Sequence, residues 1–117
     1  MPDRMKKVNS LIQKIVGEIV QNEITSDKVH AFFYTVTKVT TSADLHYSSV
    51  YISVLGDQDK AHEGFAILCK QLKIIQRIFA TKIRLKFTPK LHLEFDDSAL
   101  YASRIENIIN KIHENDQ

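Results

Sequence analysis

Two neighbouring segments of this chain carry the residue pattern of a β-hairpin, which limits the folds open to it. Residues 31–41 are rich in aromatic and β-branched side chains, and residues 47–55 alternate between polar and apolar positions through Val50, Ile52 and Val54. Such side chains are favoured on a pleated surface that is half buried. Residues 42–45 form a short polar turn between them. An antiparallel pair of strands is therefore predicted, and its apolar face needs other elements to cover it.

Helical spacing occurs on both sides of the hairpin. Residues 3–21 are predicted to form a first helix, because apolar side chains recur three and four positions apart: Val8, Leu11, Ile12, Ile15 and Ile19. Residues 25–30 are expected to be a polar connection. A second helix is predicted from Asp59 or a close neighbour to about Ala80. Its apolar face holds Phe65, Leu68, Leu72, Ile75 and Phe79, and burial is also expected for Ile67, Ile74 and Ile78 on its flank.

The last third of the chain predicts one more strand and one more helix. Residues 82–95 alternate between polar and apolar side chains, and Pro89 interrupts them in a way that favours a bulge or an edge position. A final helix is predicted from about Ser98 to His113, with Asp97 or Ser98 as its cap. The resulting order, α-β-β-α-β-α, predicts an α+β fold in which a three-stranded sheet packs against helices.

The length and composition of the chain fit a single domain, residues 1–117. Cys69 is the only cysteine, which excludes an internal disulfide and is typical of a reducing compartment. No apolar run approaches the roughly 20 residues of a membrane span. The polar residues 1–10 do not resemble a secretory signal. A cytoplasmic protein that does not enter the membrane is expected.

Positive charge is concentrated in one part of the chain. Seven of the sixteen Lys and Arg residues lie in residues 70–90, where there is no Asp or Glu; they are Lys70, Lys73, Arg77, Lys82, Arg84, Lys86 and Lys90. The other nine share the rest of the chain with all fourteen acidic residues, which gives that part a net charge of −5. One cationic segment in an otherwise acidic protein is the distribution expected of a site for a polyanion such as RNA.

The spacing of these cations predicts that they are exposed. Lys70, Lys73 and Arg77 recur at three and four positions and point about 150° away from the apolar face of their helix. Lys82, Arg84 and Lys86 would share one face of the following strand. A solvated helix face is the ordinary explanation of such side chains, but ordinary solvated faces mix both signs of charge. The seven cations are therefore predicted to contact RNA phosphates.

Catalytic and metal-binding patterns are missing from the sequence. The five histidines are scattered, with none at the i, i+4 spacing of a helical zinc pair. Cys69 has no second cysteine nearby and is expected to be an inert, partly buried thiol. Asp96 and Asp97 fit a helix cap better than an acid–base pair. We therefore expect no enzyme activity, no cofactor, no metal and no small-molecule substrate.

Three groups of residues give the chain a resemblance to bacterial ribosome-binding factor A. The groups are VTKV, SADL and VYISV at residues 36–39, 42–45 and 50–54; LKFTPKL at residues 85–91; and Asp96, Ser98 and Arg104 near the end. The resemblance extends from about Arg4 to Ile112. It implies a KH-like domain of type II, with the order α-β-β-α-β and a C-terminal helix. It also implies a factor for late assembly of the free 30S subunit and 16S rRNA processing, which binds rRNA near the 5′-terminal helix.

The chain departs from the family pattern in its second helix. The family typically has an Ala-x-Gly kink there, at the place where other KH domains carry GxxG, but the aligned residues here are Gln71, Leu72 and Lys73. Nothing in this triplet favours a break, so a continuous helix is predicted. Without a glycine loop, side chains such as Lys70 and Arg77 are expected to make more of the RNA contacts.

Two other functions stay open from the residues alone. One is a general KH-like RNA-binding module without a ribosomal role, which would bind unrelated structured RNAs with comparable affinity. The other is a small protein-interaction domain whose cationic segment binds an acidic partner protein. Such a complex would persist after nuclease treatment. A monomer is expected, because nothing in the pattern demands a dimer.

Overall fold

The computed structural model describes residues 2–98, so all but the first residue of the helix predicted from Ser98 to His113 lies outside the described part of the chain. The elements, in chain order, are α1 (Pro2–Glu18), η1 (Ile19–Glu23), α2 (Asp27–His30), β1 (Tyr34–Thr41), β2 (Tyr47–Val54), α3 (Gln58–Cys69), α4 (Leu72–Lys82) and β3 (Lys90–Phe95). The first helix and the hairpin agree with the prediction. The expected connection at residues 25–30 contains the short helix α2.

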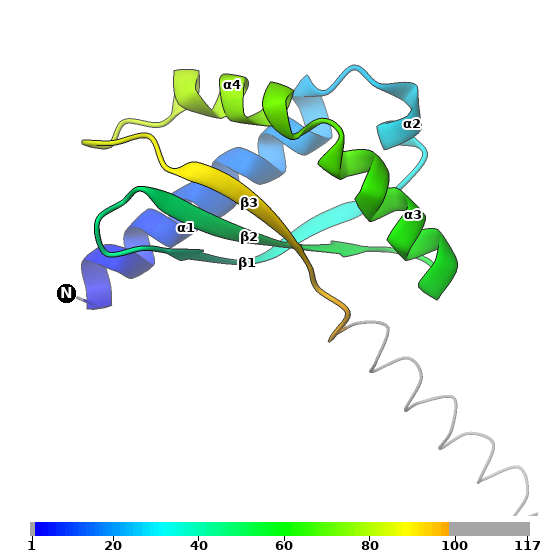
Figure 1. Ribbon diagram of the computed structural model, residues 1–117, viewed down its shortest axis with the longest axis horizontal. Coiled ribbons are helices and arrows are strands. Elements are labelled where there is room, and N and C mark those ends of the chain that lie inside the picture. The colour runs from blue at the N-terminus through cyan, green and yellow to red at the C-terminus, as the bar shows by residue number, and fades with distance from the viewer. Residues whose placement is uncertain (1, 99–117) are drawn as a thin grey trace, which may run out of the picture.

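The three strands form one mixed sheet in the order β1-β2-β3 (Figure 1). β1 and β2 are antiparallel, with Val36 opposite Ile52, and a bulge interrupts their pairing between Val36 and Lys38. β2 and β3 are parallel, with Val50 opposite Leu93. Parallel neighbours cannot be joined by a tight turn, so α3 and α4 form the crossover that connects them.

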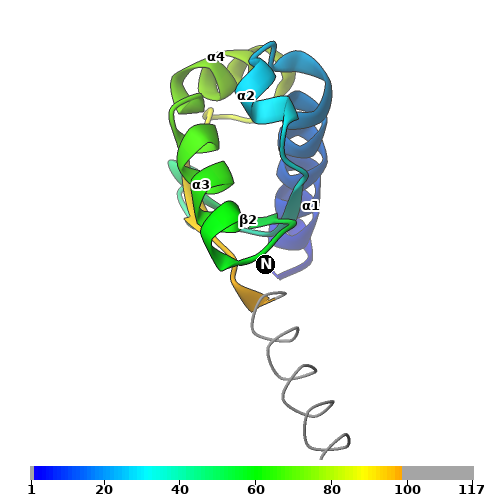
Figure 2. The same ribbon diagram turned by 90° about the vertical axis from the view of Figure 1, so that its right-hand side faces the viewer.

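The helices cover one face of the sheet, and the core lies between the two layers. Figure 2 shows α1 and α3 on opposite flanks, α4 and α2 at the top and β2 at the bottom. Along β2, Ser48, Val50, Ile52 and Val54 are buried, whereas the alternate residues face the side of the sheet that no described helix covers. The helices supply their own buried residues, which include Ile12, Val16, Ile19, Leu68, Ile75 and Phe79.

The single helix predicted from Asp59 to Ala80 is wrong, because the chain bends between α3 and α4. Lys70 has φ −66° and ψ −19°, and Gln71 has φ −93° and ψ 5°. Both conformations are open to any L-residue, so this bend needs no glycine. The two helices also have different partners: α3 packs on β2, whereas α4 packs on β3, α1 and η1. Packing on different elements therefore sets the bend, and the residue types at the bend do not reveal it.

The strand predicted over residues 82–87 is also wrong. Lys82 is the last residue of α4, and residues 83–89 are irregular until β3 begins at Lys90. Ile83 is buried and Leu85 is half-buried, but Phe87 is exposed. Pro89 is fully buried just before β3, where its missing N–H costs the sheet no hydrogen bond. The alternation of apolar residues thus belongs to an irregular segment that packs Ile83 and, in part, Leu85 against the core.

Candidate nucleic-acid interface

Two of the three cations of α4 form an exposed row on the outer side of the crossover. Lys73 and Arg77 lie one helical turn apart and are both exposed, and Lys70 is exposed at the bend that precedes them. The opposite side of α4 buries Ile75 and Phe79. Ile74 is 44% exposed beside this row, so its expected burial is wrong, whereas Ile67 and Ile78 are partly buried and pack against the core.

Among the residues that the structure describes, Lys82 is the one of the seven cations with an acidic partner in an ion pair. Its Nζ lies 2.8 Å from Glu23 Oε1, which places the end of α4 against η1. The hydrogen bond that Lys82 donates to Glu23, with the charges of Glu23 and Glu18, raises the pKa of Lys82 above its ordinary value. Part of its charge is thereby balanced within the protein. The Lys82 side chain is consequently less available to an outside anion than its position in the sequence suggests.

The remaining cations, Arg84, Lys86 and Lys90, do not share a strand face. Arg84 and Lys86 are exposed in the irregular segment, and Lys90 is the first residue of β3. The Lys90 N–H donates to the carbonyl oxygen of His46 at 2.8 Å, which ties this segment to the β1–β2 turn. The seven predicted residues therefore extend from the bend, along α4, to the hairpin end of the sheet.

Gln76 holds this cationic segment to the sheet, and its role was not predicted. Its Nε2 donates to the carbonyl oxygen of Pro89 at 3.0 Å. Its Oε1 accepts from the Leu91 N–H at 2.7 Å. One amide on α4 thus satisfies both a carbonyl and an N–H of the backbone that leads into β3. No local pattern in the sequence marks this glutamine, because its backbone partners lie 13 and 15 positions away along the chain.

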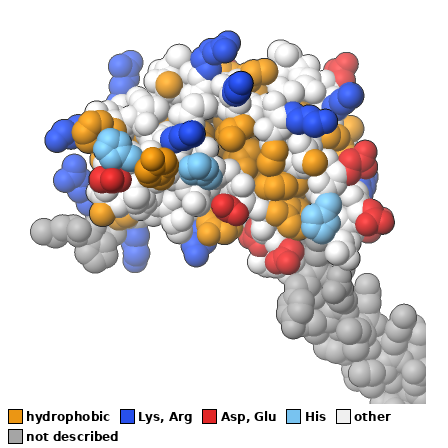
Figure 3. All heavy atoms as spheres, viewed as in Figure 1, with side chains coloured by type: hydrophobic (Ala, Val, Ile, Leu, Met, Phe, Trp, Pro, Cys, Tyr) orange, Lys and Arg blue, Asp and Glu red, His pale blue; other side chains and the backbone are white. Residues whose placement is uncertain are grey.

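Charge is segregated on the surface of the described residues. In Figure 3, Lys and Arg side chains lie along the upper rim, where Figure 1 places α4, and at the left-hand end. Acidic side chains gather at the lower right, around α3, whose first residues include Asp59 next to the cap residue Asp57. A polyanion would be attracted to the α4 side and repelled by the start of α3.

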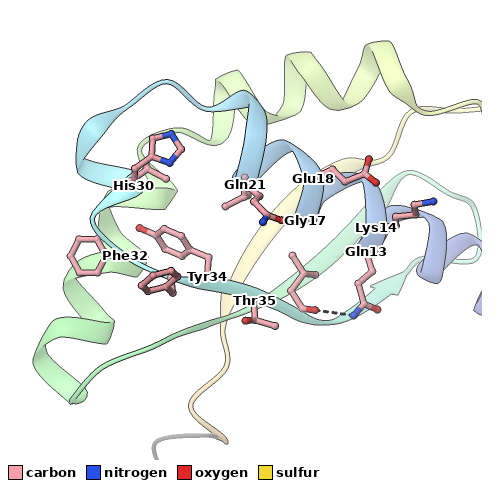
Figure 4. Close-up of a pocket in the computed structure, with 13 residues that line it drawn as sticks. Gln13, Lys14, Gly17, Glu18, Gln21, His30, Phe32, Tyr34 and Thr35 are labelled. Carbon is pink, nitrogen blue, oxygen red and sulfur yellow. Dashed lines mark hydrogen bonds between the residues drawn. The ribbon is translucent and has the colours of Figure 1, made fainter.

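A groove of about 570 Å³ lies elsewhere, between α1 and the start of β1 (Figure 4). Gln13 reaches from α1 to β1 beside the groove and donates from Nε2 to the carbonyl oxygen of Val36 at 2.8 Å. Among the side chains that line the groove, the charges of Lys14 and Glu18 offset each other. The groove therefore has none of the charge excess of the α4 surface.

No described element offers a metal centre or a membrane span. Within residues 2–98, no group of three or more His, Cys, Asp or Glu side chains is placed to hold a metal ion. No helix in the same range is long and apolar enough to cross a membrane. Cys69 is half-buried on α3, and burial raises the pKa of its thiol. A raised pKa leaves less of the nucleophilic thiolate at neutral pH.

Fold and surface together define a small α+β domain that presents a cationic helix and loop on the crossover between two parallel strands. The family model described as ribosome-binding factor A matches residues 4–109, which is most of the chain. The chain therefore belongs to the ribosome-binding factor A family.

Solved structures of this family share the fold. The crystal structure of ribosome-binding factor A from Thermus thermophilus has a TM-score of 0.64 at 16% identity, and the match covers 78% of this chain and 93% of that one. A solution structure of a Thermotoga maritima protein described as a ribosome-binding factor A has a TM-score of 0.65 at 27% identity, covering 78% and 85%. A homology model of the Thermus thermophilus factor, fitted into a cryo-EM map of its complex with the 30S subunit, has a TM-score of 0.58 at 19% identity, covering 76% and 91%.

Proposed function

We propose that this protein is a cytoplasmic, non-enzymatic assembly factor that binds the free 30S ribosomal subunit. In this proposal it acts late in subunit maturation and assists the processing of 16S rRNA near the 5′-terminal helix. The observation that carries the proposal is an exposed cationic segment in a chain of the ribosome-binding factor A family. The partner follows from the relative that was fitted into a map of a 30S complex.

The docking surface in this proposal is the α4 row with the cations that follow it. Lys70, Lys73 and Arg77 are exposed, and no acidic residue lies between Gly64 and Leu93. Each RNA phosphate that such a side chain neutralises releases condensed counterions, so binding weakens as salt rises. Lys82 contributes least, because Glu23 pairs with it.

The domain also acts as a KH-like module of type II in this proposal. The unit β2-α3-α4-β3 has two helices joined by a short bend between two parallel strands, and Lys70 and Gln71 form that bend. Half-buried apolar side chains also lie between α3 and β3, among them Phe65 and Phe95 with ring centroids 5.3 Å apart. Figure 3 shows hydrophobic side chains gathered in this central area. Without glycine at the bend, cationic side chains replace close backbone contacts to RNA.

Co-sedimentation with ribosomal particles tests the proposal. The protein should travel with free small subunits more than with assembled ribosomes, and its bound fraction should fall steeply as salt rises. The double variant Lys73→Glu, Arg77→Glu should lose most of this binding and show a smaller salt slope. Lys60→Glu on α3 is the matched control, because Lys60 is exposed beside the acidic start of that helix. Equal partition across all particles contradicts the proposal, and a similar affinity for unrelated structured RNAs supports the general RNA-binding module instead.

A further inference from the structure

Two pairs of aromatic rings lie at the hairpin end of the sheet, at the junction of three segments. The rings of His46 and Phe87 have centroids 4.6 Å apart at an interplanar angle of 32°. Those of Tyr47 and His92 have centroids 5.8 Å apart at 31°. His46 is the last residue of the β1–β2 turn, and Tyr47 is the first residue of β2. The β1–β2 turn, the irregular segment before β3, and β3 itself thus each contribute to this surface, which we call the aromatic tip.

Backbone hydrogen bonds hold the aromatic tip in place. The Ser42 N–H donates to the Tyr47 carbonyl oxygen at 2.8 Å, which closes the turn. The Lys90 N–H donates to the His46 carbonyl oxygen at 2.8 Å, and Lys90 is the strand partner of Tyr47. The backbone that carries His46, Tyr47 and His92 is therefore fixed by the sheet and the turn, and the ring of Phe87 packs on His46 from the irregular segment.

The rings are exposed, although apolar side chains are usually covered in a stable fold. Tyr47 is 55% exposed and Phe87 is 41% exposed, and both histidines are also exposed. The core cluster of the described residues includes none of the four. Neighbouring exposed rings of this kind mark a contact surface more often than a structural need.

Positive charge surrounds the aromatic tip. Lys86 Nζ lies 5.5 Å from the centroid of the Phe87 ring, and Arg84 and Lys90 are exposed nearby in sequence. The acidic residue of the turn, Asp44, is engaged locally, because its Oδ1 accepts hydrogen bonds from the Ser42 hydroxyl at 2.6 Å and the His46 N–H at 3.1 Å. Figure 3 shows histidine and hydrophobic side chains side by side at the left-hand end, with Lys and Arg side chains around them.

We propose that the aromatic tip binds unpaired nucleotides of RNA by stacking their bases on its rings. Nucleobases present flat π faces, and proteins bind unpaired bases on aromatic side chains next to cations that reach the phosphates. An acidic peptide would need the cations alone, and an apolar peptide would need the rings alone. The combination of four exposed rings with Arg84, Lys86 and Lys90 fits a strand of RNA. The inference rests on the proposed RNA-binding function and adds single-stranded RNA as the element contacted at this end.

Binding of the full chain to two labelled oligomers of equal charge tests the proposal. One is octauridylate, and the other is the same ribose-phosphate backbone without bases. Stacking predicts tighter binding of octauridylate at the same salt, on the order of tenfold for each stacked base. Phe87→Ser and Tyr47→Ser should each remove about that factor for octauridylate and change nothing for the abasic oligomer. Tyr47→Phe keeps a ring and should keep the preference.

Phe33→Ser is the matched control, because Phe33 is 76% exposed just before β1, at the far end of the sheet from the turn. It should bind both oligomers as the wild type does. Equal affinity of the wild type for the two oligomers overturns the inference, as does an equal loss in Phe33→Ser and Phe87→Ser. Competition by hexaglutamate that is as strong as that by octauridylate, and unaffected by Phe87→Ser, also overturns it. Thermal unfolding of each variant checks folding, and Phe87→Ser, outside the regular elements, carries the test if Tyr47→Ser unfolds.

The two proposals can fail separately. If the protein binds 30S subunits but does not distinguish the oligomers, the inference is wrong and the assembly-factor function stands. If it prefers octauridylate but does not bind 30S subunits, the aromatic tip stands and the ribosomal role is wrong.

Discussion

Gln76 and Leu91 are joined by a hydrogen bond between α4 and β3: the side-chain oxygen of Gln76 accepts from the backbone N–H of Leu91 at 2.7 Å. The same amide donates to the Pro89 carbonyl oxygen, so α4 binds the chain on both sides of Lys90. Leu91 is 1% exposed, so its N–H has little access to water. The position of the cationic segment relative to the sheet therefore depends on a neutral side chain.

Replacing Gln76 by alanine should destabilise the protein more than a typical surface substitution. The change leaves a buried N–H and a buried carbonyl without partners, which costs about 1–3 kcal/mol. Urea unfolding measures this free energy, and Gln21→Ala, at an exposed position of η1, should change it by less than about 0.5 kcal/mol. Equal stability of the two variants would show that water replaces the Gln76 amide.

Glu23→Gln should increase affinity for RNA. Glu23 pairs with Lys82 at 2.8 Å, so the substitution frees a cation and removes a negative charge near α4. Exposed ion pairs are weak, so the gain is up to about fivefold at low salt and disappears at high salt. Fluorescence anisotropy with small-subunit rRNA at two salt concentrations measures the effect. A loss of affinity would show that the ion pair orients Lys82 for binding.

Two glycines should respond in opposite ways to alanine. At Gly64 a Cβ atom would lie 2.6 Å from Cδ1 of Phe32 and 2.9 Å from Cγ1 of Val54, so Gly64→Ala overpacks the contact between α3 and β2 and costs about 1–3 kcal/mol. At Gly17, on α1, nothing lies within 4 Å of the added atom. Gly17→Ala should stabilise the helix by roughly 0.5–1 kcal/mol. Thermal and urea unfolding of the pair measure both signs, and equal effects would contradict the close packing at Gly64.

Asp96 should stabilise the protein at neutral pH, and this stabilisation should be lost in acid. Hydrogen bonds from the Ser98 hydroxyl, the Thr37 hydroxyl and the Ser98 N–H hold the pKa of Asp96 below its ordinary value of 3.8. The folded state thus favours the charged form, and this stabilisation is present above the unfolded pKa and is lost as pH falls through the folded one. Asp96→Asn should therefore lose less stability than the wild type between pH 5 and 2, by under about 1 kcal/mol because solvent screens the carboxylate. Asp97→Asn is the control, and an unchanged acid profile in Asp96→Asn would contradict the assignment.

The hairpin and the first helix could be predicted because their signals are local. Val50, Ile52 and Val54 fix which face of β2 is buried, and that face is the one the helices cover. Lys73 and Arg77 could be predicted to be exposed for the same reason, since three- and four-residue spacing on a helix determines direction. Neither result depends on residues distant in the sequence.

The bend at Lys70 and Gln71 could not be predicted, because it depends on the different partners of α3 and α4. The end of α4 at Lys82 and the exposure of Phe87 depend likewise on distant contacts, to Glu23 and His46. The same holds for the aromatic tip, whose rings come from residues more than forty positions apart. Spacing along the chain carries no information about such pairs.

The parallel pairing of β2 with β3 affects how the cationic surface can vary among related proteins. Parallel strands need a crossover connection, and six of the seven cations lie on the one that joins β2 to β3. The seventh, Lys90, is the first residue of β3. Residues 57–90 thus form one contiguous segment, which we call the cassette, and the sheet holds its two ends near the end of β2 and the start of β3. Exchange of that cassette between relatives would transfer the cationic surface as a unit, and the β1–β2 hairpin would stay as the constant frame that receives it.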